Sequence, residues 1–241
     1  MNCKIISCGV FKHELERIAP DADIEFLELG EHAHPDTLRG KLQSRLDAAT
    51  GCDAVLLCYG LCGRATDGLT AKHCPVVLPR SHDCCGILLG SRKRFEEIFK
   101  PMPSTPFASI GFAESGDYFF KDGTLTPGDA YAELVAEYGE DDAKYVWDAM
   151  HPKLDGKLQP VYFIHTVPDP AAVEKCRAKA AEEERDFREL DGDLRLLKML
   201  LAGDWPEDEF LVVPPGRTIR QVGDWDEIIR SCRACPENGH S

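Results

Sequence analysis

The apolar run Ala54–Tyr59 (AVLLCY) and the loop Gly60–Arg64 (GLCGR) that follows it decide the fold class of this chain. A short, continuous apolar run bounded by turn residues is typical of a strand buried on both faces, as the strands of parallel sheets are. Strand-like and helix-like segments alternate on either side of this run. We therefore expect a parallel sheet whose crossover connections are helices.

Four strand–helix units occupy the first hundred residues. The expected strands are Lys4–Cys8, Ile24–Leu29, Ala54–Tyr59 and Pro75–Leu78, and the expected helices are Phe11–Ile18, Pro35–Ala49, Asp67–Lys72 and Gly86–Phe99. This pattern predicts a Rossmann-like α/β fold with a mostly parallel sheet and helices on both faces, in which residues 1–100 form a four-unit βα core.

The second half of the chain leaves two arrangements open. Residues 101–216 form either the remainder of the same domain or a second lobe, smaller and helical. The expected strands are Phe107–Phe112, Tyr162–His165 and Phe210–Val213, and the expected helices lie within Pro127–Met150, Ala171–Leu190 and Asp193–Leu201. Residues 217–241 are a C-terminal extension, and we expect the tail from Arg230 onward to be loosely held.

The acidic composition excludes some classes of partner. The chain has 241 residues and a formal net charge of −14, whereas nucleic-acid binding draws on clustered Lys and Arg. No stretch approaches the ~20 apolar residues of a membrane helix, and the N-terminus lacks the basic region and long apolar core of a secretory signal. We expect a soluble, cytoplasmic protein that binds neither nucleic acid nor membrane.

Eleven cysteines are present, and in a reducing compartment they are more plausible as ligands, redox groups or buried small hydrophobes than as disulfides. Cys8 ends an expected strand, and Cys62 and Cys84 each stand in the loop after one. Ligands of open α/β sheets bind outside the carboxyl ends of the strands. With the common strand order 2-1-3-4, the three loops would meet at one crevice.

The residues of these loops predict a metal site. Cys8, Cys62, Cys84 and His82 resemble a ligand set for zinc or an iron–sulfur cluster, because thiolates suit either and imidazole suits zinc. His82 is also a candidate proton donor, and Glu114 a candidate base or carboxylate ligand. The candidate cofactor-binding residues, Gly63 and Arg80, stand in the same loops.

Other interpretations of the cysteines stay open. Cys84 precedes an expected helix, whose dipole would lower its thiol pKa and make it a metal-free nucleophile, a role that Cys85 could take instead. The cysteines could also be buried small hydrophobes, which is the expected role of Cys58. Structural roles are likewise expected where no motif surrounds the cysteine, at Cys3, Cys52, Cys74 and Cys176. The tail motif Cys232–Cys235 (CRAC), with His240, is half of a zinc-ribbon pattern and lacks the second pair.

The runs CYGLCG (58–63), LPRSHDC (78–84) and LLGS (88–91) resemble the family called domain of unknown function 1638. The features that fit the same pattern, over about residues 1–216, are Cys8-Gly9, Glu14, Gly111, Glu114 and Val213–Gly216. The chain departs from that pattern before Glu114, where it has Gly111-Phe112-Ala113 in place of an aromatic GW. The resemblance implies an anaerobic setting, often beside corrinoid-dependent methyltransferase systems.

The leading hypothesis is therefore a protein that binds an iron–sulfur cluster or zinc. It would act on a small molecule in anaerobic methyl-group, one-carbon or redox metabolism, with a corrinoid supplied by a partner corrinoid protein or methyltransferase. One alternative is a non-catalytic accessory or metal-delivery module for a corrinoid methyltransferase system. A second alternative is a metal-free cysteine-nucleophile enzyme.

Overall fold

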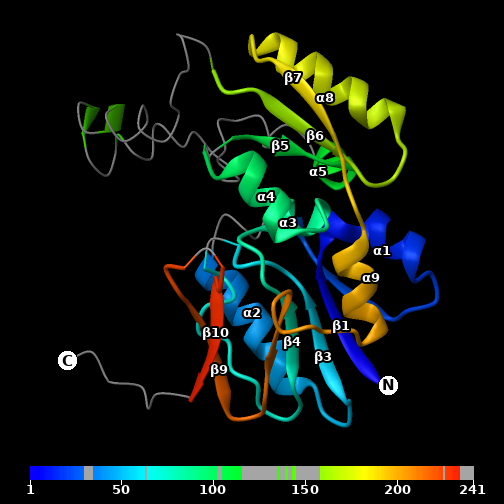
Figure 1. Cartoon of the computed structure of the whole chain (residues 1–241), viewed down its shortest axis with the longest axis vertical. Helices are drawn as coiled ribbons and strands as arrows, with labels where there is room; N and C mark the ends of the chain where they lie inside the picture. Colours follow the sequence, from blue (N-terminus) through cyan, green and yellow to red (C-terminus); the bar gives the residue numbers. More distant parts are fainter. Residues whose placement is uncertain are drawn as a thin grey trace.

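The computed structural model arranges the chain as two stacked parts along its longest axis (Figure 1). It describes residues 1–29, 35–62, 64–101, 105–115, 158–224 and 226–233, together with a few positions between 135 and 144. The lower part in Figure 1 holds the larger, five-stranded sheet, and the upper part holds a three-stranded sheet. Helices α3 (Cys84–Leu88) and α4 (Arg92–Phe99) lie between them.

The first sheet has the strand order β2-β1-β3-β4-β8. Its strands are β1 (Cys3–Cys8), β2 (Ile24–Leu27), β3 (Ala54–Cys58), β4 (Val76–Pro79) and β8 (Phe210–Val213). All neighbouring pairs are parallel except β4 and β8, which are antiparallel. Every residue of β3 is buried, as its apolar run predicts. The mixed α/β class and the order 2-1-3-4 are thus confirmed.

Helix α1 (Lys12–Ile18), after the 3-10 turn η1 (Gly9–Phe11), and helix α2 (Pro35–Ala48) agree with expectation. The single helix expected at Gly86–Phe99 is instead two, α3 and α4. Gly90 adopts a left-handed φ of 69° between them, and the Ser91 side chain caps α4 by accepting from the Arg94 N–H. The short helix expected at Asp67–Lys72 is wrong, because Thr70 forms a bridge to Thr218.

The second sheet is parallel, with the order β5-β6-β7. Its strands are β5 (Phe107–Ala108), β6 (Val161–His165) and β7 (Phe187–Asp191). The strand expected at Phe107–Phe112 is shorter than predicted, because the chain turns into helix α5 (Ile110–Ser115). The helices expected within Pro127–Met150 fall almost entirely outside the described residues.

The helix expected at Ala171–Leu190 is wrong beyond Glu182. Helix α8 (Pro170–Glu182) ends where Glu184 takes a left-handed φ of 56°, and the chain then forms β7. The buried Arg185 fixes this corner, because its guanidinium donates to the Glu183 carboxylate and to the Gln159 carbonyl. The charged sequence favours a helix locally, but pairing of β7 with β6 overrides that preference.

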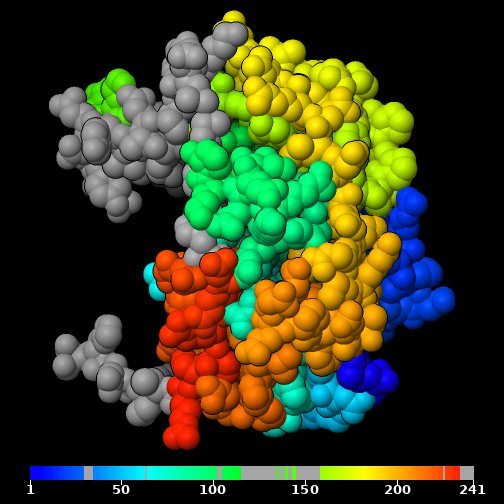
Figure 2. All heavy atoms as spheres, in the orientation of Figure 1, coloured from blue at the N-terminus to red at the C-terminus, as the bar shows by residue number. Residues whose placement is uncertain are grey.

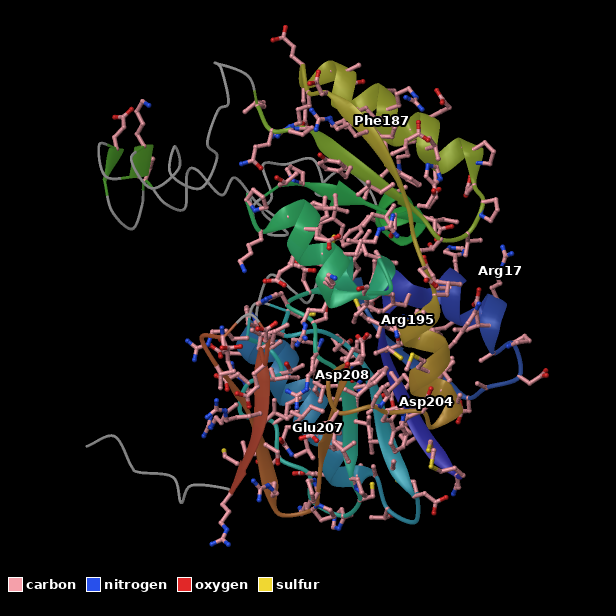
Figure 3. The ribbon with its side chains drawn as sticks, in the orientation of Figure 1. Arg17, Phe187, Arg195, Asp204, Glu207 and Asp208 are labelled. Atoms are coloured by element: carbon pink, nitrogen blue, oxygen red, sulfur yellow. The ribbon has the colours of Figure 1, made fainter. Side chains whose placement is uncertain are left out.

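The chain then returns to the first sheet. Figure 3 labels Phe187 where β7 begins and Arg195 where helix α9 (Arg195–Ala202) begins, so the two mark the ends of the descending connection. Helix α9 packs against β3 and β4 and leads into β8. Strands β9 (Arg217–Gln221) and β10 (Ile229–Arg233) follow as an antiparallel hairpin. Figure 2 shows this hairpin, in red to orange, on the near face, where it contacts β8.

The expectation of a loose tail from Arg230 is therefore wrong for its first four residues. Strand β10 pairs with β9 along its whole length, with Cys232 opposite Thr218. Two arginines hold it from the side: Arg217 donates to the hydroxyl and the carbonyl of Ser231, and Arg80 donates to the Ile229 carbonyl. The sequence of the tail lacks a strong strand pattern, so only these long-range contacts order it.

A tight junction joins the two sheets, and we call it the sheet junction. It comprises Val10 in η1, Glu14 in α1, Gly111 in α5, Thr166 after β6 and Gly192 after β7. The Thr166 hydroxyl donates to the Glu14 carboxylate at 2.5 Å. A Cβ on Gly111 would come within 2.2 Å of the Val10 carbonyl oxygen, so only glycine allows this approach.

None of the helices within the described residues is both long and apolar enough to cross a membrane.

We predict that Gly111→Ala lowers the free energy of unfolding by about 1–3 kcal/mol, the usual cost of forcing an extra methyl group into a packed contact. Gly40→Ala in α2 is the matched control, since a Cβ there meets nothing within 4 Å. The control should leave stability unchanged or raise it by up to about 1 kcal/mol. Urea unfolding measures both, and equal effects at the two positions would refute the close packing of the sheet junction.

Candidate functional site

Main-chain hydrogen bonds pair the loop after β3 with the loop after β4. The Leu61 N–H donates to the Ser81 carbonyl at 2.8 Å, and the Cys62 N–H donates to the His82 carbonyl at 3.0 Å. Gly60 makes this possible, because a Cβ there would come within 2.9 Å of the Asp83 backbone. Cys62 itself adopts a left-handed φ of 48°. Such strain in a residue other than glycine is held only where the surroundings fix it, often at functional sites.

This pairing, with the neighbouring β1–β3 pair that carries Cys8, brings together the three cysteines predicted from the sequence, and we call Cys8, Cys62 and Cys84 the thiol cluster. They are 1%, 6% and 5% exposed, so all three are buried. Burial raises the pKa of Cys62 and of Cys84 well above the ordinary value, and the neighbouring cysteines add to the effect. Cys8 and Cys62 both act on Cys84, so the three thiols lie close enough to interact electrostatically.

Asp83 belongs to the same group of acidic side chains, although no sequence motif predicts a role for it beside the thiols. Its carboxylate caps α3 by accepting from the Gly86 N–H at 3.3 Å. Burial raises the pKa of Asp83 to about 6, and its negative charge in turn raises the pKa of Cys62 and of Cys84. An Asp directly before a helix is a capping signal in the sequence, but nothing there indicates that it faces two thiols.

The thiol cluster has the donor chemistry of a soft-metal site. Within the part of the chain that the structure describes, no three His, Cys, Asp or Glu side chains are already arranged to hold a metal ion. Raised pKa values favour the protonated thiols at Cys62 and Cys84, and metal binding requires the thiolates. Ligation would therefore release protons and needs a rearrangement of side chains. The chemistry of the donors fits zinc or an iron–sulfur cluster.

His82 lies beside the thiol cluster in sequence, but its described contacts are with α4. Its ring packs against Phe95 with centroids 5.8 Å apart. Burial lowers the pKa of His82, with smaller effects from Glu96, which raises it, and Arg92, which lowers it. A neutral imidazole is the form that binds metal or accepts a proton. The roles predicted for His82 as fourth ligand or proton donor stay predictions.

Arg80 is buried at the C-terminal end of β4, where it contacts the main chain. Its guanidinium donates to the carbonyls of Glu207, Glu227 and Ile229, and thereby ties β4 to the hairpin. These bonds give Arg80 a structural role, and a role in cofactor binding stays a prediction. Gly63, the other residue assigned to cofactor binding, lies outside the described residues.

Glu114 lies on α5 rather than after a strand. Its exposed carboxylate is 2.6 Å from His13 Nε2 in α1, so the two residues form an ion pair when His13 is protonated. Glu14, next to His13, is fully buried in the sheet junction. Its Oε1 accepts from Thr166, while its Oε2 accepts no hydrogen bond from the residues that the structure describes. Burial raises the pKa of Glu14, which favours its neutral form.

Cysteines outside the thiol cluster have separate surroundings. Cys58 is a core residue, as expected, and burial raises its pKa to about 12. Cys85 is fully buried too, and the causes of its raised pKa are burial and Asp83 rather than the thiol cluster. Cys232 lies in β10, whereas Cys235 and His240 fall outside the described residues.

Fold and site together define an α/β protein with a buried thiol cluster at the carboxyl ends of a mostly parallel sheet. Residues 26–201 match the family described as protein of unknown function (DUF1638), so the chain belongs to that family. This confirms the resemblance. The match includes Cys62, His82, Cys84 and Glu114, while Cys8 precedes it. No curated protein and no solved structure matches the chain.

We predict that Glu14→Gln changes how stability depends on pH. A carboxyl whose pKa is raised by folding stabilises the protein below its ordinary pKa, 4.5 for Glu14. That contribution is lost as the pH rises toward the native pKa, by at most about 1.4 kcal/mol per pH unit for one proton. The Glu14→Gln variant is neutral at this position and lacks the loss, so it should gain on the wild type as the pH rises above about 4.5.

Urea unfolding between about pH 4 and pH 8, a range that brackets the titration of a carboxyl with a raised pKa, measures the difference. Glu16→Gln is the control, because Glu16 is exposed on the same helix and should follow the wild type. Parallel stability curves for Glu14→Gln and the wild type would contradict a buried, neutral carboxyl.

Proposed function

We propose that the protein holds zinc or an iron–sulfur cluster on the thiolates of Cys8, Cys62 and Cys84. The observation that carries this proposal is the convergence of three buried thiols from three separate strand-end loops. Buried acidic groups gathered at one point repel one another once ionised, and a bound cation would relieve that repulsion. Three thiolates leave a further position, for which His82 and Asp83 compete.

The burial of the cluster favours this proposal over a metal-free nucleophile. That alternative relies on a helix dipole that lowers the pKa of Cys84. Helix α3 has only five residues, and burial raises the pKa of Cys84 instead. Reactive cysteines are partly exposed and electropositive in their surroundings. Cys84 has neither property, whereas a metal ligand can be buried.

The chemistry follows from which group is bound. Zinc would lower the pKa of a substrate thiol and suit methyl transfer, whereas a cluster would support one-electron redox steps. The chain itself would exclude water and hold the sulfurs in place through the paired loops after β3 and β4. It would also supply His82 or Glu114 for proton transfer. Carboxyl-end sites of this kind are characteristic of Rossmann-like sheets with helices on both faces, and that is the finer fold class that we propose.

The setting that we propose rests on the family resemblance. It is cytoplasmic, anaerobic methyl-group, one-carbon or redox metabolism, with a small-molecule substrate and a corrinoid supplied by a partner corrinoid protein or methyltransferase. A non-catalytic accessory or metal-delivery role in the same system is the alternative. Turnover assays with thiols and methyl donors separate the two roles once the metal is known.

We predict that Cys62→Ala and Cys84→Ala each abolish metal binding, because each removes one of three thiolate ligands. Anaerobic purification followed by elemental analysis measures zinc and iron, and a broad absorption band at about 400 nm marks a cluster. Cys176→Ala is the control, since Cys176 is equally buried but lies in α8 beside the second sheet. Full occupancy in either of the first two variants would refute the ligand assignment.

A second pair of variants identifies the remaining ligand. Loss of a fourth ligand or of its hydrogen-bonded support should weaken metal binding by about 10–100-fold. That loss in His82→Ala alone would support the ligand predicted from the sequence, and the same loss in Asp83→Asn alone would assign the position to the carboxylate. Unchanged affinity in both variants would mean that neither side chain is a ligand.

A further inference from the structure

A second group of cysteines lies at the opposite end of the same sheet, and we call Cys3, Cys52 and Cys74 the N-edge thiols. Cys3 begins β1, and the other two stand two residues before β3 and β4. The register places Cys3 opposite Ala54 and Val55 opposite Val76, so the three segments are neighbours. Strands β1, β3 and β4 thus each have a cysteine near both ends, because Cys8 ends β1 and Cys62 and Cys84 follow β3 and β4.

Two of the N-edge thiols are in direct contact. The Sγ atoms of Cys52 and Cys74 lie 3.0 Å apart. A disulfide bond is about 2.05 Å long, so the two sulfurs need to approach by only about 1 Å more. Burial is the largest cause of the raised pKa values of Cys3 and Cys74. Cys52 adds to the rise at Cys3, and Cys3 adds to the rise at Cys74, so Cys3 lies near the other two thiols. The Cys52–Cys74 contact is therefore part of a three-thiol group.

The backbone around this contact is held in place. The Asn2 N–H donates to the Asp53 carboxylate at 2.7 Å, and the Asn2 side chain donates to the Gly51 carbonyl at 3.1 Å. The Asp53 N–H returns a hydrogen bond to the Asn2 carbonyl at 2.8 Å. These bonds fix the turn that carries Cys52. Two sulfurs held in contact by an ordered backbone act on each other at a high effective concentration.

The sulfurs of Cys52 and Cys74 differ in their exposure to solvent, and therefore in which of them reacts first. Cys52 is partly exposed and Cys74 is buried, so a reagent from solvent reaches Cys52 first. Burial and the contact with Cys52 raise the pKa of Cys74 to about 12. Cys74 is thus a poor target for external reagents, but it lies beside Cys52 once that sulfur has reacted.

We propose that Cys52 and Cys74 form a reversible disulfide by exchange with a low-molecular-weight disulfide, RSSR. The Cys52 thiolate attacks one sulfur of RSSR, which breaks the S–S bond and forms a mixed disulfide with release of RS⁻, which takes up a proton. Cys74 then gives its proton to solvent and attacks the Cys52 sulfur, releasing the second RS⁻. The two protein thiols lose two electrons, and RSSR gains them to become two RSH.

The new bond would tie the start of β3 to the start of β4. The two cysteines are 22 positions apart, and the segment between them contains Cys62 of the thiol cluster. Oxidation at one end of the sheet would therefore restrict the segment that carries a ligand at the other end. The inference itself does not depend on the proposed metal, because it rests on residues at the opposite edge.

The test uses the full chain, reduced under anaerobic conditions and incubated with oxidised glutathione. Free thiols are then blocked with N-ethylmaleimide, and a tryptic digest is analysed without reduction. The tryptic peptide of residues 73–80 (HCPVVLPR) carries Cys74 and no other cysteine. We expect it to be linked to the peptide of residues 46–64, with fragmentation placing the bond on Cys52, and to be released by dithiothreitol.

Matched variants make the assignment specific. Cys52→Ser should leave Cys74 in the unlinked, blocked form, whereas Cys3→Ser and Cys176→Ser should keep the linked peptide. Circular dichroism confirms that each variant is folded. A Cys74 that stays fully unlinked in the folded wild type, or that links to Cys3 instead, would overturn the proposal. Because the readout is one peptide, its result is independent of whether the thiol cluster binds metal.

Discussion

The pairing of the loops after β3 and β4 is the interaction on which the site depends. Two main-chain hydrogen bonds, from Leu61 to Ser81 and from Cys62 to His82, prolong the contact of the two strands beyond their carboxyl ends. Glycine at position 60 is needed because the Asp83 backbone occupies the space that a Cβ would take. This contact holds the loop of Cys62 beside the segment that leads to Cys84, and so keeps the two sulfurs near each other.

The site is also connected to the second sheet. Cys8 leads directly into η1, whose Val10 carbonyl packs on Gly111, and α3 runs from Cys84 to Leu88, whose carbonyl accepts from the Asp193 N–H. Cys8 and Cys84 thus each stand at the start of a short helix, η1 and α3 respectively, and each of these helices also contacts the region between the two sheets. A change in the spacing of the two sheets would be transmitted to the sulfurs, because packed interfaces move as units.

Burial gives the acidic groups of this protein a common property. Cys62, Cys84, Asp83 and Glu14 all have raised pKa values, and in each case burial is the largest cause. Burial disfavours the charged form of an acid unless a cation or hydrogen-bond donors compensate for the lost water. The protein therefore carries protonated thiols at Cys62 and Cys84 near the C-terminal edge of the first sheet, a state that a bound metal would reverse.

Local patterns along the chain predict the parallel strands and the residues that end them. The uninterrupted apolar run of β3 and the cysteine that follows each of three strands are local patterns, and a parallel sheet gathers its carboxyl ends at one edge whatever its details. Cys8, Cys62 and Cys84 could be predicted for that reason.

Local patterns do not predict the break between α3 and α4, the change from α8 to β7, or the pairing of β10. Contacts between distant residues outweigh local preferences at these places. The same holds for Asp83 beside the thiols and for Cys52 against Cys74, which share no motif. These side chains are close together in the fold, and their spacing along the chain does not indicate it.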